Sequence, residues 1–303
     1  MTELGFGTYH PSSNLRPLLQ YAVERDWSWI DTAPNYGAAQ HTIGSLVNEG
    51  KIDWTSCSVS SKVGFLADDR ERAYLLRSGL ITPNCIIHNN VLSPEYVRYR
   101  AVLNCSELVC RPLRLLFLHN PEIHSRVIGR ESFVDRLRAC FAECESLRAE
   151  NYIEAYGIAT WHGLFSTLSL SEIYNLARDG AGANNGFKAI QLPLSLVRSE
   201  ELKEAVLSGA GPLIEAKELG LQVFGSSPLH GGELPRLLLP GFREPFGADL
   251  SSAQVCLQVL RSVGCIDRVL IGCRREVHVD EATALETMDT APMNMVAELL
   301  SMI

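Results

Sequence analysis

The sequence contains no apolar run that approaches the roughly 20 residues needed to cross a lipid bilayer. It begins without a basic segment followed by an apolar stretch, so no secretory signal is predicted. Positive charge is also scarce: 27 Lys and Arg face 35 Asp and Glu, and the formal net charge is −8. Because nucleic-acid binding depends on clustered basic side chains, we expect neither a nucleic-acid partner nor a membrane partner.

The cysteines form no C-x-x-C pair, and their number, nine, is odd. Both facts argue against a disulfide framework. Cys140 and Cys144 are one helical turn apart, a spacing that metal ligation would allow. We favour buried thiols on a helix face in a reducing cytosol, and therefore expect a cytoplasmic protein without a metal site.

A glycine-rich dinucleotide-binding turn is missing as well. The first apolar segment runs into GFGTYH, which has G-x-G but lacks the third glycine of G-x-G-x-x-G. An open, doubly wound sheet usually carries that turn after its first strand. It is therefore the second choice among folds.

Short apolar segments alternate with helix-like segments along the 303 residues, of which 46% are apolar. We predict strands at 4–9, 27–32, 58–63, 113–119, 154–160, 189–195, 221–227 and 268–273. We predict helices at 14–26, 38–50, 94–109, 131–150, 212–220 and 251–263. This alternation is typical of parallel strands with helical crossovers.

The repeat of strand and helix predicts an α/β fold, a single (β/α)8 TIM barrel spanning residues 1–303. The segment 64–93 is long for the connection between the third strand and the third helix. Such loops lie on the catalytic face of a barrel, so 64–93 is a candidate substrate loop.

Polar side chains with complementary chemistry stand at three successive strand ends. Asp31 ends the second strand with Tyr36 in the loop beyond it, Lys62 ends the third strand, and His119 ends the fourth. Taken singly, each is more often a structural residue. Together they suggest a tuned phenol: Asp31 holds Lys62, and the ammonium lowers the Tyr36 pKa from its usual value of about 10. A neutral His119 would then hydrogen-bond a substrate carbonyl.

Three of these segments, IDTAPNYG, SSKVG and LLFLHNPE, resemble the signature segments of the aldo-keto reductase superfamily. Four later segments, YGIATW, AIQLPLS, VFGSSPLHGG and VLIGCRREVHVDEA, resemble its later strands, so the likeness covers nearly the whole chain. The resemblance implies a TIM barrel that binds NADP(H) without a Rossmann domain and passes a hydride between the nicotinamide and a carbonyl carbon. Its catalytic tetrad falls on Asp31, Tyr36, Lys62 and His119, with Tyr36 as the proton donor.

The resemblance also implies a set of cofactor contacts. Gln191 and Thr160 match positions that contact the nicotinamide carboxamide. The loop beneath the pyrophosphate and the residues that hold the adenosine end match Ser226, Ser227, Pro228, Leu229, Gly272, Arg274, Arg275 and Glu281. Two arginines suit bidentate binding of the 2′-phosphate and favour NADPH over NADH, with a solvated helix start as the alternative.

Four residues at three places in the chain depart from the family pattern. Ala159 and Thr160 replace a common Ser-Asn pair, Ser226 replaces a Tyr that often stacks on the nicotinamide, and Ala282 replaces an Asn near the adenine. Each change is expected to weaken cofactor binding by about 1 kcal/mol, the net scale of one hydrogen bond.

Tyr9, Asn120, Trp161 and His162, together with His10, follow strand ends and are expected near the carbonyl. Aromatic walls of this kind suit a mid-sized organic carbonyl or the corresponding alcohol. Two other functions stay open. One is a cofactor-binding regulatory barrel with weak turnover. The other is a non-redox lyase or epimerase that uses Lys62 or Tyr36 as acid or base, although Asp31 favours a charged Lys62 over the neutral amine of a Schiff base.

Overall fold

The structure is a computed structural model of the chain, and it describes residues 2–9, 14–161, 163–238, 240–247 and 249–303. Within these ranges, parallel strands close into an eight-stranded barrel in the order β1-β10-β9-β8-β7-β6-β3-β2. The strands are β1 (Glu3–Gly7), β2 (Trp29–Asp31), β3 (Ser58–Val63), β6 (Leu113–His119), β7 (Ile153–Ala159), β8 (Phe187–Pro193), β9 (Gln222–Ser226) and β10 (Arg268–Ile271). The predicted (β/α)8 barrel is therefore confirmed, and the open sheet is excluded.

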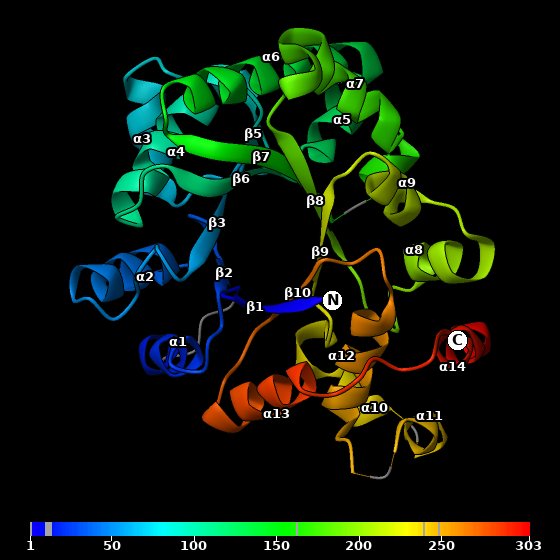
Figure 1. Cartoon of the computed structure of the whole chain (residues 1–303). Helices are drawn as coiled ribbons and strands as arrows, with labels where there is room; N and C mark the ends of the chain where they lie inside the picture. Colours follow the sequence, from blue (N-terminus) through cyan, green and yellow to red (C-terminus); the bar gives the residue numbers. More distant parts are fainter. Residues whose placement is uncertain (1, 10–13, 162, 239, 248) are drawn as a thin grey trace.

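Helices surround the strands on all sides of the barrel (Figure 1). The longer ones are α1 (Leu15–Val23), α2 (Ala39–Asn48), α4 (Pro94–Glu107), α6 (Arg130–Ala149), α7 (Leu170–Ala181), α12 (Ser252–Ser262), α13 (Glu276–Glu286) and α14 (Met293–Met302). The shorter ones include α5 (Glu122–Ile128), α8 (Glu200–Lys203), α9 (Pro212–Glu218), α10 (Leu234–Leu237) and α11 (Pro240–Arg243). Local sequence sets several of their starts: the Ser169 and Ser251 hydroxyls form capping boxes that satisfy free backbone N–H groups of α7 and α12.

The segment 64–93 is not a continuous loop, unlike our expectation. It contains α3 (Asp69–Arg77) and an antiparallel hairpin made of β4 (Ile86–Ile87) and β5 (Asn90–Val91). The hairpin turns at His88 and Asn89, whose φ values of 49° and 62° fit a tight two-residue turn. The Val91 amide then donates to the Gly64 carbonyl at 2.8 Å. The hairpin thereby returns to the carboxyl end of β3.

The barrel interior is filled by side chains rather than open. Its apolar cluster consists of Trp29, Leu115, Phe117, Ala159, Ala189, Phe224 and Leu270. Near the start of β10, the Arg268 guanidinium lies 4.5 Å from the centroid of the Trp29 ring and 6.0 Å from that of Phe224. Arg268 therefore covers the floor of this cluster, leaving the carboxyl ends of the strands as the place for chemistry.

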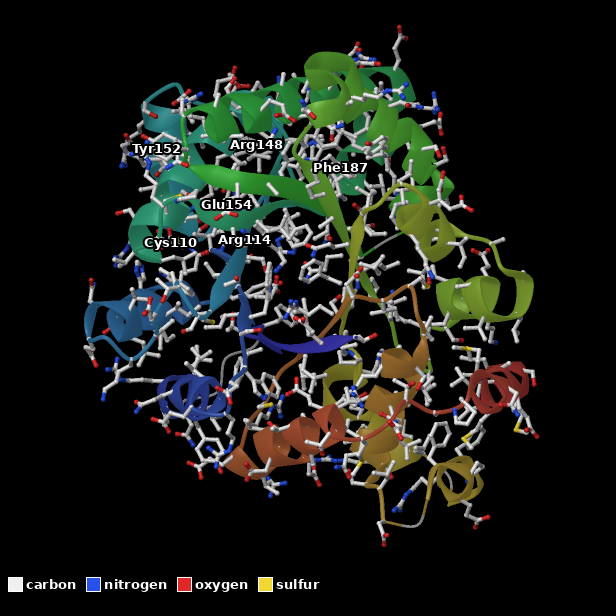
Figure 2. All side chains as sticks on the ribbon, in the orientation of Figure 1. Cys110, Arg114, Arg148, Tyr152, Glu154 and Phe187 are labelled. Atoms are coloured by element: carbon white, nitrogen blue, oxygen red, sulfur yellow. The ribbon has the colours of Figure 1, made fainter. Side chains whose placement is uncertain are left out.

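The amino-terminal ends of β6 and β7 carry structural contacts. Figure 2 shows Arg114 and Glu154 side by side on β6 and β7, where they form an ion pair. The Arg148 Nε donates to the Glu154 carbonyl at 3.0 Å, tying α6 to β7. Because these groups lie away from the carboxyl ends of the strands, we read them as contributions to stability.

Cys140 and Cys144 are fully buried on α6. Among the described residues, no group of three or more His, Cys, Asp or Glu side chains is arranged to hold a metal ion. In the same part of the chain, no helix has the length and apolar character needed to cross a membrane.

Candidate active site

The ends of β2 and β3 bring Asp31 and Lys62 into a buried ion pair. Lys62 Nζ lies 2.6 Å from Asp31 Oδ2, and the two residues are 2% and 4% exposed. Lys62 also donates to the Thr32 carbonyl at 3.0 Å, while Ser60 Oγ donates to Asp31 Oδ1 at 2.8 Å. Burial lowers the Lys62 pKa and the contact with Asp31 opposes that shift. A buried ammonium held in this way is a charged lysine with a fixed direction.

Tyr36 and His119 lie beside this pair. The Lys62 Nζ is 5.0 Å from the centroid of the Tyr36 ring. The His119 ring meets Tyr36 edge to face at 6.1 Å between centroids. The structure thus brings together all four residues that the sequence placed at three strand ends.

The pKa of Tyr36 differs from the sequence-based expectation. Burial raises it well above its usual value, and Asp31 and Tyr9 act in the same direction. The expected net lowering of the pKa does not occur, because desolvation of the phenolate, together with the nearby carboxylate, disfavours ionisation and outweighs the charge of Lys62. Tyr36 therefore keeps its proton at neutral pH, as a proton donor must.

The pKa of His119 moves the other way. Burial lowers it well below its usual value, and the charge of Lys62 adds to that effect. A neutral imidazole can donate one hydrogen bond to a carbonyl oxygen, so the expected state of His119 agrees with its environment.

A polar network behind β3 was missed by the sequence analysis. Asn104 on α4 donates to the Lys62 carbonyl at 3.0 Å. The Asn104 Oδ1 in turn accepts from Gln40 Nε2 at 3.1 Å and from Arg100 Nε at 3.0 Å. The spacing of Arg100 and Asn104 on one helix face was visible, but polar side chains on a predicted helix are usually read as solvated.

Gln191 lies two residues before the carboxyl end of β8. Its side chain is buried, and its Oε1 has no hydrogen-bond partner in the described part of the chain. Buried polar atoms normally have partners, so an unpaired acceptor at a strand end suggests a group that is supplied from outside.

Thr160, the other expected carboxamide contact, forms hydrogen bonds within the protein. Its hydroxyl donates to Glu122 Oε1 at 2.8 Å and accepts from the Leu164 amide at 3.3 Å. Glu122 Oε1 also accepts from the Trp161 amide at 3.0 Å. The buried Glu122 therefore shapes the turn after β7, a role that its place in HNPE did not reveal.

The expected phosphate-binding residues follow β9 and β10. Ser226 ends β9, and Ser227, Pro228 and Leu229 come directly after it. Ser227 has a φ of 53°, a left-handed conformation that turns the chain sharply at this strand end. These placements leave the loop at the same face of the barrel as Gln191.

Arg274 and Arg275 lie after Gly272, at the amino terminus of α13, and both are exposed. The Arg275 guanidinium contacts His278 Nε2 at 3.0 Å, and the Arg274 amide donates to His278 Nδ1 at 3.3 Å. Burial and the two arginines lower the His278 pKa, so this imidazole adds no charge and accepts a hydrogen bond at only one of the two nitrogens. Among the described residues neither arginine forms an ion pair with a carboxylate.

Glu281 lies one to two turns further along α13 and is half-buried. Its backbone carbonyl accepts from Gln254 Nε2 at 2.9 Å, which ties α13 to α12. Its carboxylate lies on the helix that follows the two arginines, and its expected place near an adenine stays a prediction.

Of the expected substrate residues, Tyr9 packs against Tyr36. Its ring is 61% exposed and meets the Tyr36 ring edge to face at 5.0 Å. Asn120 follows His119 with a φ of 52°, and its amide donates to the Ala159 carbonyl at 2.7 Å. Trp161 is half-buried, with the Arg198 guanidinium 4.6 Å from its ring centroid. His162 and His10 lie outside the described residues.

Phe65 is a further aromatic neighbour that the sequence analysis missed. Its ring meets His119 edge to face at 4.9 Å, from the segment that joins β3 to α3. Together with Tyr9, Phe65 gives the tetrad an aromatic surround.

No family model matches the chain, and no curated protein matches it by sequence. Solved structures do match. The aldo-keto reductase AKR11C1 from Bacillus halodurans, in its holo form, has a TM-score of 0.71 at 16% identity, over 99% of this chain and 91% of that one. The chain has the fold of the aldo-keto reductases.

Two further aldo-keto reductases agree over similar lengths. A thermostable enzyme in complex with the inhibitor epalrestat has a TM-score of 0.69 at 16% identity, over 99% of this chain and 95% of that one. An enzyme from a deep-sea metagenome library has a TM-score of 0.68 at 14% identity, over 99% of this chain and 91% of that one. At such identities the likeness establishes the aldo-keto reductase fold, and the residues of this chain must carry the argument for function.

Proposed function

We propose that this protein is an NADPH-dependent oxidoreductase of the aldo-keto reductase superfamily that interconverts a small carbonyl compound and its alcohol. One observation carries the proposal: Tyr36, Lys62, Asp31 and His119 meet at the carboxyl ends of three strands in a barrel of this fold. Their protonation states are those that carbonyl reduction needs, namely a protonated phenol and a neutral imidazole.

The residues at the strand ends fit a nicotinamide cofactor. Gln191 offers an unpaired buried acceptor for a carboxamide. Arg274 and Arg275 offer two guanidinium groups at the amino terminus of α13, where the helix dipole also favours an anion. We assign the remaining contacts to Ser226, Ser227, Pro228, Leu229, Gly272, Thr160 and Glu281. When bound, the cofactor supplies or accepts the hydride.

The chain's own groups handle the proton. Tyr36 holds a proton that burial keeps on its oxygen until a carbonyl oxygen takes it. The ammonium of Lys62 then favours the phenolate left behind. His119 donates a hydrogen bond to the same carbonyl oxygen, which stabilises the charge that develops there.

The proposal is tested with Tyr36→Phe. Loss of a positioned proton donor is expected to reduce turnover about 10²- to 10⁴-fold, with little change in NADPH affinity. Turnover is followed by the loss of NADPH absorbance over a panel of ketones and aldehydes, and affinity by fluorescence titration. Tyr74→Phe, on the exposed face of α3, is the matched control. Wild-type turnover in Tyr36→Phe would refute this role.

A regulatory barrel with weak turnover is the second candidate, because Thr160 is engaged by Glu122 instead of facing a ligand. Single-turnover kinetics separates the two functions: slow hydride transfer with tightly retained NADPH supports the regulatory barrel. For the non-redox alternative that uses Lys62 or Tyr36 as acid or base, the 2.6 Å contact with Asp31 disfavours the neutral Lys62 that a Schiff base needs. Borohydride trapping with substrate tests for a Schiff base directly.

A further inference from the structure

The hairpin of β4 and β5 places Asn90 between two strands of the tetrad. Asn90 is 1% exposed, and its Nδ2 donates to the His119 carbonyl at 2.8 Å. Pairing between β3 and β6 ends at Val63 and Leu118, so the next bond to β6 comes from this side chain. Asn90 therefore extends the barrel's hydrogen bonding past the point where β3 leaves it.

The approach of these segments depends on Gly64. A Cβ atom at Gly64 would lie 2.7 Å from the His119 oxygen and 3.0 Å from Asn90 Nδ2. Its φ of 151° also lies in a region that side chains disfavour. Only glycine lets the chain turn away from β3 while Asn90 reaches His119.

His124 on α5 completes a chain of contacts. Its residue surface is 0% exposed, and its Nε2 lies 3.1 Å from Asn90 Oδ1. Because the Asn90 amide nitrogen donates to His119, its oxygen faces His124, and this assigns the imidazole proton to Nε2. Burial lowers the His124 pKa to about 4, which keeps the ring neutral. Nδ1 has no partner among the described residues.

We propose that Asn90 and His124 are positioning residues that hold His119 in its catalytic orientation. The hydrogen bonds run from His124 Nε2–H to Asn90 Oδ1, and from Asn90 Nδ2–H to the His119 carbonyl. They fix the backbone from which the imidazole projects, while Phe65 packs against the ring at 4.9 Å. This inference rests on the proposed function, because it concerns the geometry of the same tetrad.

Three variants test this relay, by which we mean the hydrogen bonds from His124 through Asn90 to the His119 carbonyl. Asn90→Leu keeps the volume and removes both hydrogen bonds. His124→Leu removes the donor to Asn90, whereas His124→Gln offers an amide nitrogen where Nε2 stood. We expect kcat to fall about 10-fold in Asn90→Leu and about 3- to 10-fold in His124→Leu, since 1.36 kcal/mol corresponds to a factor of ten. His124→Gln should stay within about two-fold of wild type, and NADPH affinity should be unchanged throughout.

His41→Gln, on the exposed face of α2, is the control for the histidine replacement. Equal kcat values in His124→Leu and His124→Gln would overturn the relay, as would wild-type kcat in a folded Asn90→Leu. A fall in NADPH affinity that parallels the fall in kcat would also overturn it, because it would indicate general damage to the barrel.

A spectroscopic measurement separates this inference from the proposed function. In protein labelled with 15N-histidine, the His119 ring signals are identified by their loss in His119→Asn. We expect these signals to shift or broaden in Asn90→Leu and His124→Leu but not in His124→Gln. If the wild-type protein reduces no carbonyl, the proposed function fails while this result still stands. Unchanged His119 signals in all variants would refute the relay itself.

Discussion

Among single residues, the ion pair between Lys62 and Asp31 determines how the ammonium is oriented toward Tyr36. Both groups are almost without solvent, so each depends on the other for its charge. The carboxylate is further fixed by Ser60, whose Oγ accepts from Trp29 Nε1 at 3.1 Å. A pair held this firmly orients the ammonium toward Tyr36, and it makes the loss of one partner costly.

Asp31→Asn and Lys62→Met should each lower the free energy of unfolding by about 3–5 kcal/mol, because each leaves an unpaired buried charge. The double variant Asp31→Asn with Lys62→Met should lose less than the sum of the single changes, since no buried charge remains. Urea unfolding of the three variants measures these values. Additive losses would show that the two side chains do not act as a pair.

His124 predicts a pH dependence of stability. Its folded pKa of about 4 lies below the usual value of 6.5. Between these two pH values the unfolded chain binds a proton on this histidine and the folded protein does not. The stability from the neutral ring is therefore fully present above pH 7 and is lost as the pH falls. Between pH 7 and pH 5 the loss is about 2 kcal/mol. Burial is the largest cause of the lowered His124 pKa, Arg136 lowers it further, and the hydrogen bond with Asn90 raises it.

The measurement is urea unfolding of the wild type and His124→Gln at pH 7 and pH 5. The variant should lose about 2 kcal/mol less than the wild type over this interval. His119 titrates in the same direction in both proteins, so it cancels in the comparison. Equal losses in the two proteins would contradict a neutral, buried His124.

Among the helices, we assign selection of the proposed cofactor to the amino terminus of α13. Its helix dipole and the guanidinium groups of Arg274 and Arg275, which form no ion pair with a carboxylate among the described residues, favour a doubly charged phosphate over a hydroxyl. His278 packs against Arg275 without carrying a competing charge. This arrangement fits the 2′-phosphate that distinguishes NADPH from NADH.

Arg274→Ala combined with Arg275→Ala should weaken NADPH binding about 10- to 100-fold, on the scale of one or two charged hydrogen bonds. NADH binding should change by less than about three-fold, as it makes no such bonds. Fluorescence titration with each cofactor provides the numbers. Arg138→Ala on α6 controls for the loss of surface charge. An equal loss for both cofactors would show that these arginines do not read the 2′-phosphate.

The packing of α2 on α4 leads to a second prediction at this scale. A Cβ at Gly44 would lie 2.0 Å from the Glu107 carbonyl oxygen. Gly44→Ala should therefore reduce stability by about 1–3 kcal/mol, although alanine favours helices. Gly264→Ala, where no atom lies within 4 Å of the added Cβ, should be nearly neutral. Thermal unfolding compares them, and a stabilised Gly44→Ala would contradict the close approach.

At the scale of the whole molecule, much of the architecture followed from local sequence. Each strand was predicted because its apolar run is short and bounded by polar residues, and all eight runs fall on strands of the barrel. The tetrad was found for a related reason: in a barrel, residues at successive strand ends must meet. Because the barrel closes, residues that are far apart in the sequence but stand at successive strand ends lie close together in space.

Long-range contacts were not predictable in this way. The hairpin within 64–93 contacts the end of β3, and its Asn90 contacts His119. No periodic pattern in the sequence predicts these contacts. The pKa of Tyr36 was misjudged because the sequence shows its charged neighbours but not its desolvation. Glu122 escaped notice because its partner Thr160 is distant in the chain. In each instance the missing information is a contact between separate segments.

Binding of NADPH at the strand ends is the property on which the proposed carbonyl chemistry depends. Fluorescence titration of the purified protein with NADPH and, separately, NADH measures it. We expect micromolar or tighter NADPH binding and a clear preference over NADH. Failure to bind either cofactor would contradict it.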